Sequence, residues 1–465
     1  MKRVRTYVLM IGTGLAVELL LLRFGHDLPA AQTATRVAGN SGSVEPTVMN
    51  ELAIMIVQII VIVLAGRLAG LLFRRFGQPP VIGEIAAGIF LGPSVFGSLA
   101  PELFTSLFPP QSIPALLSLS HVGLVLFMFL VGLEFAPDTM RERSEGVVVI
   151  SHISIIVPFV LGTALAIYLY PRVSDSSVTF RSFALFLGTS MSVTAFPVLA
   201  RILTDRHMLR TRMGNTVIAC AAVDDVTAWC MLAVVVMIAR AGDPLHLFIR
   251  FGLLAVYILF MIAVVRPLLK KAAPLVSRKA LDETGLAAVL VLVLASSCIT
   301  ELLGIHALFG AFLVGTILPR EGVLVESLRA HLRGLTCVIF LPLFFAITGL
   351  RTNIGLLHTG ELWLCAALIL AVAIFGKLGG AAISAVSVGL SWREATAIGV
   401  LMNTRGLMEM VVLNIGLDIG VISRGMFAMI VIMALVTTAM TAPILERLVH
   451  PREVVAAPLD MEEVA

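Results

Sequence analysis

Charged residues are scarce in this sequence. Asp, Glu, Lys and Arg make up only 13% of the 465 residues, whereas they make up about 25% of a typical soluble protein. The hydrophobic share is 59%, the mean hydropathy is +1.02, and apolar stretches of bilayer-spanning length recur along the chain. The composition excludes an ordinary soluble domain and predicts an all-α polytopic membrane protein. The net charge of +4 is better explained by charged loops at a membrane than by nucleic-acid binding.

Cysteines and catalytic motifs are also scarce. The five cysteines lie in apolar segments without metal-ligand spacing, so we interpret them as small apolar residues and expect no disulfide framework. The sequence has no GxxxxGK[ST] phosphate-binding loop, which argues against ATP-driven transport by this chain alone. It also has no GxGD motif, which an intramembrane aspartyl protease would need. We therefore expect neither an enzyme nor a cofactor.

Windows of about 20 apolar residues define the predicted membrane spans. There are thirteen such windows, at residues 51–73, 79–97, 115–135, 146–170, 180–200, 214–238, 247–268, 282–302, 304–319, 334–351, 361–388, 394–417 and 423–446. An earlier apolar run at 7–22 fits either a cleaved signal peptide or a retained extra helix. We therefore divide the chain into an N-terminal signal or anchor segment with an external linker (1–50), a transmembrane domain (51–448) and a short tail (449–465).

The distribution of Lys and Arg predicts the orientation of these spans. Most of the 33 basic residues fall on one side, among them Arg74, Arg206, Lys270 and Arg333, and the positive-inside rule makes this side cytoplasmic. The C-terminus falls on the same side, so we expect a multi-pass protein of the cell membrane with a cytoplasmic C-terminus. Six spans, one connecting span and six more give two halves of opposite orientation, as in inverted-repeat secondary transporters.

Ionisable residues at membrane depth are functional candidates, because a charge at the bilayer centre costs roughly 2.5–3.5 kcal/mol on insertion scales. Asp224 and Asp225 are adjacent in the middle of a span. Neighbours on a helix point about 100° apart, so the two carboxylates cannot share one partner on a single face. Lys377 lies about halfway along another span, and Glu84, near a cytoplasmic end, is a weaker candidate.

Other polar residues within spans allow structural explanations. Arg405 and Glu409 are four residues apart and can pair on one helix face, so a structural ion pair and a functional role both stay open. His121 and His152 lie inside or at the edge of apolar segments, where we expect hydrogen-bonded packing.

Two spans are expected to be interrupted. In the first, a cluster that includes Ser192 and Thr194 precedes Pro197, and proline removes an amide donor and disfavours helical geometry at the preceding residue. In the second half, Asn403 and Thr404 fall at a corresponding place. Paired interrupted spans are the strongest sequence indication of a transporter's ion site. The freed carbonyls and hydroxyls could then coordinate a cation at mid-depth.

Several stretches together resemble the cation:proton antiporter-2 family, the Kef-type sodium or potassium/proton exchangers. They are, in the family's order, PPVIGEIAAGIFLGPS, VGLVLFMFLVGLEF, SMSVTAFPVLARIL, AAVDDVTAW, GIHALFGAFLVG and MNTRGLMEMVVLNIG. The resemblance implies a thirteen-span inverted-repeat fold in which a core domain moves against a dimerisation domain, so we expect a homodimer in membrane lipid. It also implies two broken helices that cross at mid-membrane beside the aspartate-bearing helix.

The resemblance also implies roles for individual residues. Asp225 matches the carboxylate that binds the cation or the proton, and Asp224 matches its variable neighbour. Lys377 matches a lysine that pairs with the acidic site, while Thr194 and Ser192 match the unwound part of the first broken helix. We assign cation and proton binding to Asp225 together with Asp224, Thr194 and Ser192. We assign charge compensation to Lys377 together with Arg405 and Glu409. The sequence departs from the potassium-efflux members in lacking their regulatory nucleotide-binding domain, which puts ligand gating in doubt.

These residues predict an exchange mechanism. Desolvation raises the pKa of a carboxyl group and a nearby cation lowers it, so one carboxylate can carry either a proton or a monovalent cation. We therefore expect a secondary active antiporter that exchanges sodium or potassium for protons by alternating access, with the metal ion at Asp225. Two alternatives stay open: a channel-like potassium efflux protein, and a sodium-coupled solute symporter on the same architecture.

Overall fold

The computed structural model describes residues 2–25, 28, 51–134, 145–206, 208, 211–241, 244–277, 283–304, 306–319 and 324–448. Within these ranges all regular structure is helical. Most of the predicted external linker, at 26–50, and the predicted tail at 449–465 lie outside the described residues.

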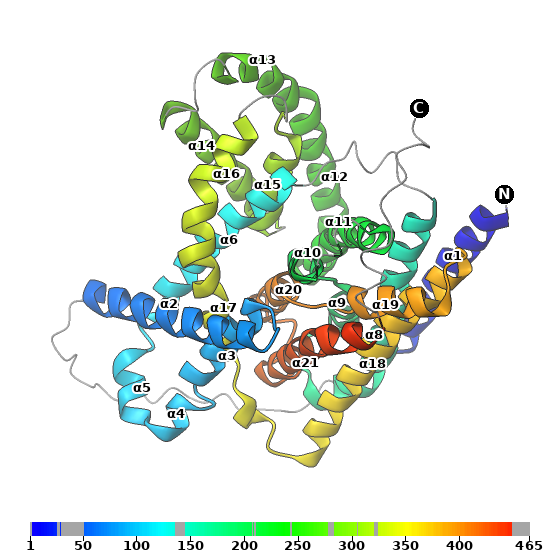
Figure 1. Ribbon diagram of the computed structural model, residues 1–465, viewed down its shortest axis with the longest axis horizontal. Coiled ribbons are helices and arrows are strands. Elements are labelled where there is room, and N and C mark those ends of the chain that lie inside the picture. Colours follow the sequence, from blue (N-terminus) through cyan, green and yellow to red (C-terminus); the bar gives the residue numbers. More distant parts are fainter. Residues whose placement is uncertain are drawn as a thin grey trace.

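The helices pack as two groups, which occupy different parts of Figure 1. The first, the scaffold group, comprises α2 (Glu51–Arg75), α3 (Pro80–Leu91), α4 (Phe96–Leu99), α5 (Pro101–Leu107), α6 (Ile113–Glu134), α12 (Pro244–Phe260), η1 (Met261–Val265), α13 (Arg266–Ser277), α14 (Glu283–Leu302), α15 (Ala307–Ile317), α16 (Leu324–Leu335), η2 (Thr336–Phe340) and α17 (Leu341–Arg351). It lies at the left and top of Figure 1.

The second, the core group, comprises α8 (Glu145–Val173), α9 (Phe180–Ser192), α10 (Phe196–Asp205), α11 (Arg212–Ala241), α18 (Gly360–Ser387), α19 (Trp392–Met402), α20 (Leu407–Asp418) and α21 (Arg424–Leu448). The short helix η3 (Ile354–Leu356) connects the two groups after α17. The groups touch where α17 packs against α20 and α3 against α21. Helix α1 (Lys2–Phe24) lies along α8 and α9.

Local sequence signals explain several helix boundaries. The side chains of Thr179 and Thr359 accept hydrogen bonds from backbone amides and cap the starts of α9 and α18. Ser391 and Glu394 form a reciprocal capping box at the start of α19. Pro80 occupies the first position of α3, where a helix has no use for the missing amide hydrogen. These signals define the starts of three core helices (α9, α18 and α19) and of the scaffold helix α3.

Small residues bring the helices of each group close together. The backbones of α6 and α15 meet at Gly132 and Gly315, where a side chain on either residue would collide with the other helix. In the core group, Gly376 and Gly380 of α18 lie against Pro158 and Val157 of α8. Glycine at helix contacts permits close backbone approach in membrane proteins. Helices α8 and α18 thereby form a tight pair that carries part of the site.

The described residues contain ten helices, or eleven if α19 and α20 form one bent span, that are long and apolar enough to cross a membrane. Helices α19 and α20 meet at an angle of 44°. The predicted spans at 180–200 and 304–319 contain shorter helices, namely α9 with α10 and α15. The chain is therefore a polytopic all-helical membrane protein, as expected from its composition.

Candidate functional site

The two interrupted helices cross in the middle of the core group. The first break lies between Ser192, where α9 ends, and Phe196, where α10 begins. The second lies between α19 and α20, at residues 403–406. The Thr194 hydroxyl donates a hydrogen bond to the Met402 carbonyl at 3.0 Å, and the Ala195 amide donates to the Thr404 carbonyl at 2.9 Å. Each break therefore provides hydrogen-bond partners for backbone groups of the other break that have no partner within their own helix.

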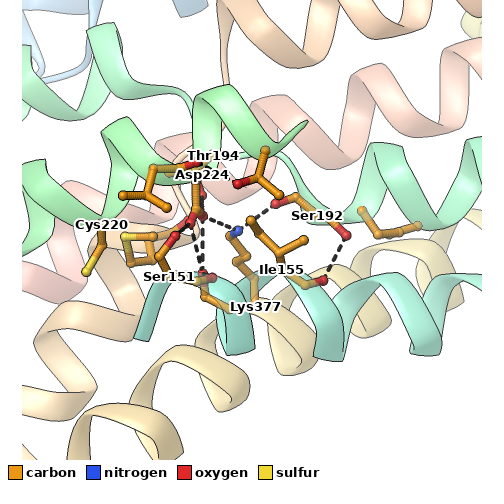
Figure 2. A network of polar contacts seen from close by, with 12 residues as sticks. Ser151, Ile155, Ser192, Thr194, Cys220, Asp224 and Lys377 are labelled. Carbon is orange, nitrogen blue, oxygen red and sulfur yellow. Dashed lines mark hydrogen bonds and ion pairs between the residues drawn. The ribbon is translucent and has the colours of Figure 1, made fainter. Parts of the chain in front are cut away.

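Asp224 of α11 is the centre of a buried polar network (Figure 2). Its Oδ2 atom lies 2.8 Å from Nζ of Lys377 and 3.0 Å from the hydroxyl of Thr194. Its Oδ1 atom accepts a hydrogen bond of 2.5 Å from Ser151 of α8, and Ser154 donates to Oδ2 at 3.1 Å. Four elements (α8, the first break, α11 and α18) thus converge on one carboxylate.

Asp225 has a different environment from its neighbour. Its side chain is also buried, but its Oδ1 atom has no hydrogen-bond partner among the described residues. A backbone hydrogen bond from Phe196, the first residue of α10, reaches the carboxylate. The amide hydrogens at a helix N-terminus carry a partial positive charge that favours an anion. Of the two aspartates, Asp225 is therefore the one with an oxygen free to accept a ligand.

The buried cations lie at the other end of the first break. Lys377 donates a second hydrogen bond of 2.6 Å to the carbonyl of Ser192, and Figure 2 shows its nitrogen between Ser192 and Asp224. Arg405 donates to the carbonyls of Ser190 and Met191 at 2.7 and 2.5 Å. These carbonyls end α9, and the C-terminus of a helix favours positive charge. The two cations therefore stabilise a helix end that is buried inside the protein.

Arg405 and Glu409 form an ion pair on one face of α20 and its preceding turn, at 2.7 Å with both side chains fully buried. The Ser190 hydroxyl donates to the other carboxylate oxygen of Glu409 at 2.5 Å. The pair thus joins the second broken helix to the first. The four-residue spacing of Arg405 and Glu409 thus produces a structural ion pair, and this pair lies next to the crossing of the two breaks.

Sequence reasoning missed two of the residues that hold Asp224. Ser151 and Ser154 lie on α8 in an apolar span, and the only signal for them was a pair of hydroxyls three residues apart. Glu84 lies on α3, where it lines a cavity between the two helix groups together with Val198 of α10 and Leu407 of α20. His152 bonds the Val148 carbonyl of its own helix, as expected, at 2.9 Å.

The fold and the site define a class of membrane transporter in which two broken helices lie beside buried charged residues. The sequence matches the family described as sodium/hydrogen exchanger, transmembrane, over residues 59–449. It is 43% identical over 401 residues to the Na(+)/H(+) antiporter NhaS4 of Synechocystis sp., a match that covers 86% of this chain and 98% of that protein. The chain belongs to the sodium/hydrogen exchanger family.

Two other relatives are longer than this chain. The Cation/H(+) antiporter 17 of Arabidopsis thaliana is 38% identical over 431 residues, and the K(+)/H(+) antiporter 1 of Saccharomyces cerevisiae is 34% identical over 431 residues. The matches cover 92% and 90% of this chain but only 52% and 49% of those proteins. The chain thus spans about half the length of these two relatives.

A solved structure has a similar fold. The sodium proton antiporter MjNhaP1 from Methanocaldococcus jannaschii superposes with a TM-score of 0.57, covering 85% of this chain and 97% of that one. The sequence identity is 15%, so this similarity supports the arrangement of the helices alone.

Proposed function

We propose that this protein exchanges a monovalent cation for protons, and that Asp225 binds the two competitively. The observation that carries the proposal is the buried Oδ1 atom of Asp225, which has no partner among the described residues. Two further buried oxygens without partners in the described part of the chain lie in the second break, Oδ1 of Asn403 and Oγ1 of Thr404. Carboxylate, amide and hydroxyl oxygens are suitable ligands for a hard cation.

Asp224 and Lys377 have a different role in this proposal. Every oxygen of Asp224 is already engaged by Lys377 or by a hydroxyl group. A cation beside Asp225 adds positive charge close to Lys377, and the lysine either shifts or releases a proton. Thr194 and Ser192 hold the break in place, and Arg405 with Glu409 neutralise charge on the second broken helix.

The wider architecture is part of the proposal. Counting each broken pair and α15 as crossings gives thirteen spans in two inverted repeats, preceded by α1 as either a signal or a retained helix. The protein would act as a homodimer in the cell membrane with its C-terminus in the cytoplasm. The scaffold group would provide the fixed, dimeric part, and the core group would move relative to it.

The direct test is exchange by purified protein in liposomes that contain a pH-sensitive dye. Adding sodium or potassium outside acid-loaded liposomes should raise the internal pH, and the apparent KM for the cation should rise as the pH falls, because protons compete for Asp225. Asp225→Asn should abolish exchange, since the substitution removes the charge with little change in volume. Dye responses that require a solute other than these cations would support a symporter instead.

The matched control is Glu361→Gln, which removes an exposed carboxylate of the core group outside the crossing. This variant should exchange at the wild-type rate. Exchange by Asp225→Asn at the same rate would exclude Asp225 from the mechanism. Cation flux without any proton movement would favour the channel-like alternative.

A further inference from the structure

The scaffold and core groups meet at an interface whose two ends differ. One end contains a cavity of about 370 Å³, which is lined by Leu130 of α6, Leu341 of α17 and Leu407 of α20, among other residues. At the opposite ends of the same three helices, the side chains of His121, Arg351 and Asp418 meet. The interface is therefore open at one end and bridged by charged groups at the other.

Asp418, the last residue of α20, contacts two scaffold helices. Its Oδ1 atom accepts a hydrogen bond of 2.5 Å from Arg351 of α17, and its Oδ2 atom lies 3.6 Å from Nε2 of His121 on α6. One turn earlier, Asn414 accepts from Arg351 at 2.8 Å and donates to Thr348 at 2.8 Å. The end of the second broken helix is thus fastened to the scaffold by one carboxylate and one amide.

A second bridge lies nearby. Arg240, near the end of α11, pairs with Glu301 of α14 at 3.1 Å. The other oxygen of Glu301 accepts a hydrogen bond of 2.8 Å from the Ala307 amide, at the start of α15. His306 precedes that helix, and its ring stands edge-on to the ring of His121 with 6.2 Å between centroids. The aspartate-bearing helix α11 is therefore also tied to the scaffold at this end.

We infer that these contacts form a gate on the predicted external side, which holds the exchanger in the inward-facing state and opens more readily when His121 is protonated. The inference rests on the proposed exchange function. The positive-inside prediction puts the charged end outside and the cavity end, with Arg329 and Arg333, in the cytoplasm. An outward-facing state must open the charged end, which separates Asp418 from His121 and Arg240 from Glu301.

The groups around His121 give the gate its dependence on pH. The imidazole faces the carboxylates of Asp418 and Glu301, the guanidinium of Arg351, and the ring of His306. Partial burial of the ring and the Arg351 guanidinium oppose a proton on His121 more than the carboxylates of Asp418 and Glu301 favour it. The side chains of His121 and Asp418 are 35% and 30% exposed, so external water reaches both. A proton therefore binds better to the open gate, in which water surrounds the ring, and shifts the population toward it.

The cavity contains a natural reporter of this state. Cys337 lines it and is partly exposed, so its alkylation rate should follow the inward-facing population. The measurement would use protein in lipid nanodiscs, with the other four cysteines (Cys220, Cys230, Cys298 and Cys365) replaced by alanine. It would be made in the Asp225→Asn background, so that titration or cation binding at the transport site does not contribute.

Asp418→Asn should lower the labelling rate of Cys337 roughly two- to five-fold, the range that one or two partly exposed ion pairs supply. Glu301→Gln is a second variant and should act in the same direction. The matched control is Glu361→Gln, which breaks a more exposed ion pair between Arg172 and Glu361 inside the core group and should leave the rate unchanged. Equal rates in Asp418→Asn, Glu301→Gln and this control would overturn the gate.

The role of His121 is tested by the ratio of labelling rates in the parent and in His121→Gln. Both proteins carry the same thiol, so the pH dependence of the thiol cancels in the ratio. The ratio should fall as the pH falls from about 8 to about 5, through the range in which histidine titrates. A ratio that does not change with pH would show that protonation of His121 does not regulate the gate, while the ion-pair gate itself would stand. Labelling does not depend on transport, so failure of the exchange proposal would be visible separately.

Discussion

At the scale of single residues, the buried pair of Asp224 and Lys377 is the central feature. Neither side chain is exposed, and an isolated charge in such a place would face a desolvation penalty of several kcal/mol. The penalty is offset because each charge has several partners: three hydroxyls besides the lysine for Asp224, and a helix-ending carbonyl for Lys377. The charges are stable together and unstable apart.

This reciprocity predicts a non-additive effect on stability. Asp224→Asn and Lys377→Met should each lower the free energy of unfolding by about 3–5 kcal/mol, since each leaves one buried charge uncompensated. The double variant should lose clearly less free energy of unfolding than the sum of the two single losses, because it removes both charges. Thermal unfolding of the four proteins in detergent measures the coupling. Strictly additive losses would show that the pair contributes nothing beyond its separate parts.

The sequence predicted these charges but not all their partners. A carboxylate or a lysine inside an apolar span is conspicuous, so Asp224, Asp225 and Lys377 could be found without a structure. Ser151 could not, because serine is common in membrane helices and only the packing of α8 on α11 brings it to Asp224. His121 was expected to serve in packing, and its approach to Asp418 depends on an interface that no local pattern encodes.

At the scale of helices, the two breaks were predictable in position and not in their contacts. Pro197 lies in the first turn of α10, where proline is tolerated, and the break precedes it. The hydrogen bonds between Ala195 and Thr404 and between Thr194 and Met402 join segments about 200 residues apart. Such pairing depends on the tertiary arrangement, and hydrophobic periodicity does not report it.

The crossing should not tolerate a side chain at Gly406. An added Cβ there would lie 2.5 Å from Cγ2 of Val198 and 3.3 Å from Cβ of Ala195, so Gly406→Ala should push the two breaks apart. We expect a loss of about 1–3 kcal/mol in stability, as for other overpacked sites, and a large fall in exchange rate. The control is Gly252→Ala on α12, where an added Cβ meets nothing within 4 Å and should be neutral or stabilising. Normal exchange by Gly406→Ala would mean that the crossing adjusts easily.

At the scale of the whole molecule, hydropathy predicted thirteen spans, whereas helix length identifies ten or eleven among the described residues. The difference arises where helices are short: α9 and α10 share one predicted span, and α15 has only 11 residues. A hydropathy window averages over the residues on both sides of a break, whereas a criterion of helix length ends the helix at the break. The two counts therefore disagree at one broken helix and at one short helix.

The orientation of the whole chain can be tested independently of transport. The positive-inside rule puts the loop around Arg206 and the C-terminus in the cytoplasm. An alkaline phosphatase fused after residue 465 should therefore be inactive, because this reporter works only outside the cytoplasm, whereas a fluorescent protein at the same point should be bright. An active phosphatase would invert the topology and place the charged gate on the cytoplasmic side.

The last prediction concerns the charge moved in each transport cycle. If Asp225 alone changed its state, one proton would exchange for one monovalent cation and the cycle would be electrically neutral. Lys377 forms an ion pair with the neighbouring carboxylate of Asp224. A cation that arrives at Asp225 repels the ammonium group of Lys377, which favours release of a second proton from the lysine. Two protons would then move for each cation, so a membrane potential of the appropriate sign should accelerate exchange. Liposomes with a potential clamped by valinomycin, with sodium as the exchanged cation, measure this directly. A rate that is indifferent to voltage while transport itself is limiting would show that Lys377 keeps its proton and serves only as the structural partner of Asp224.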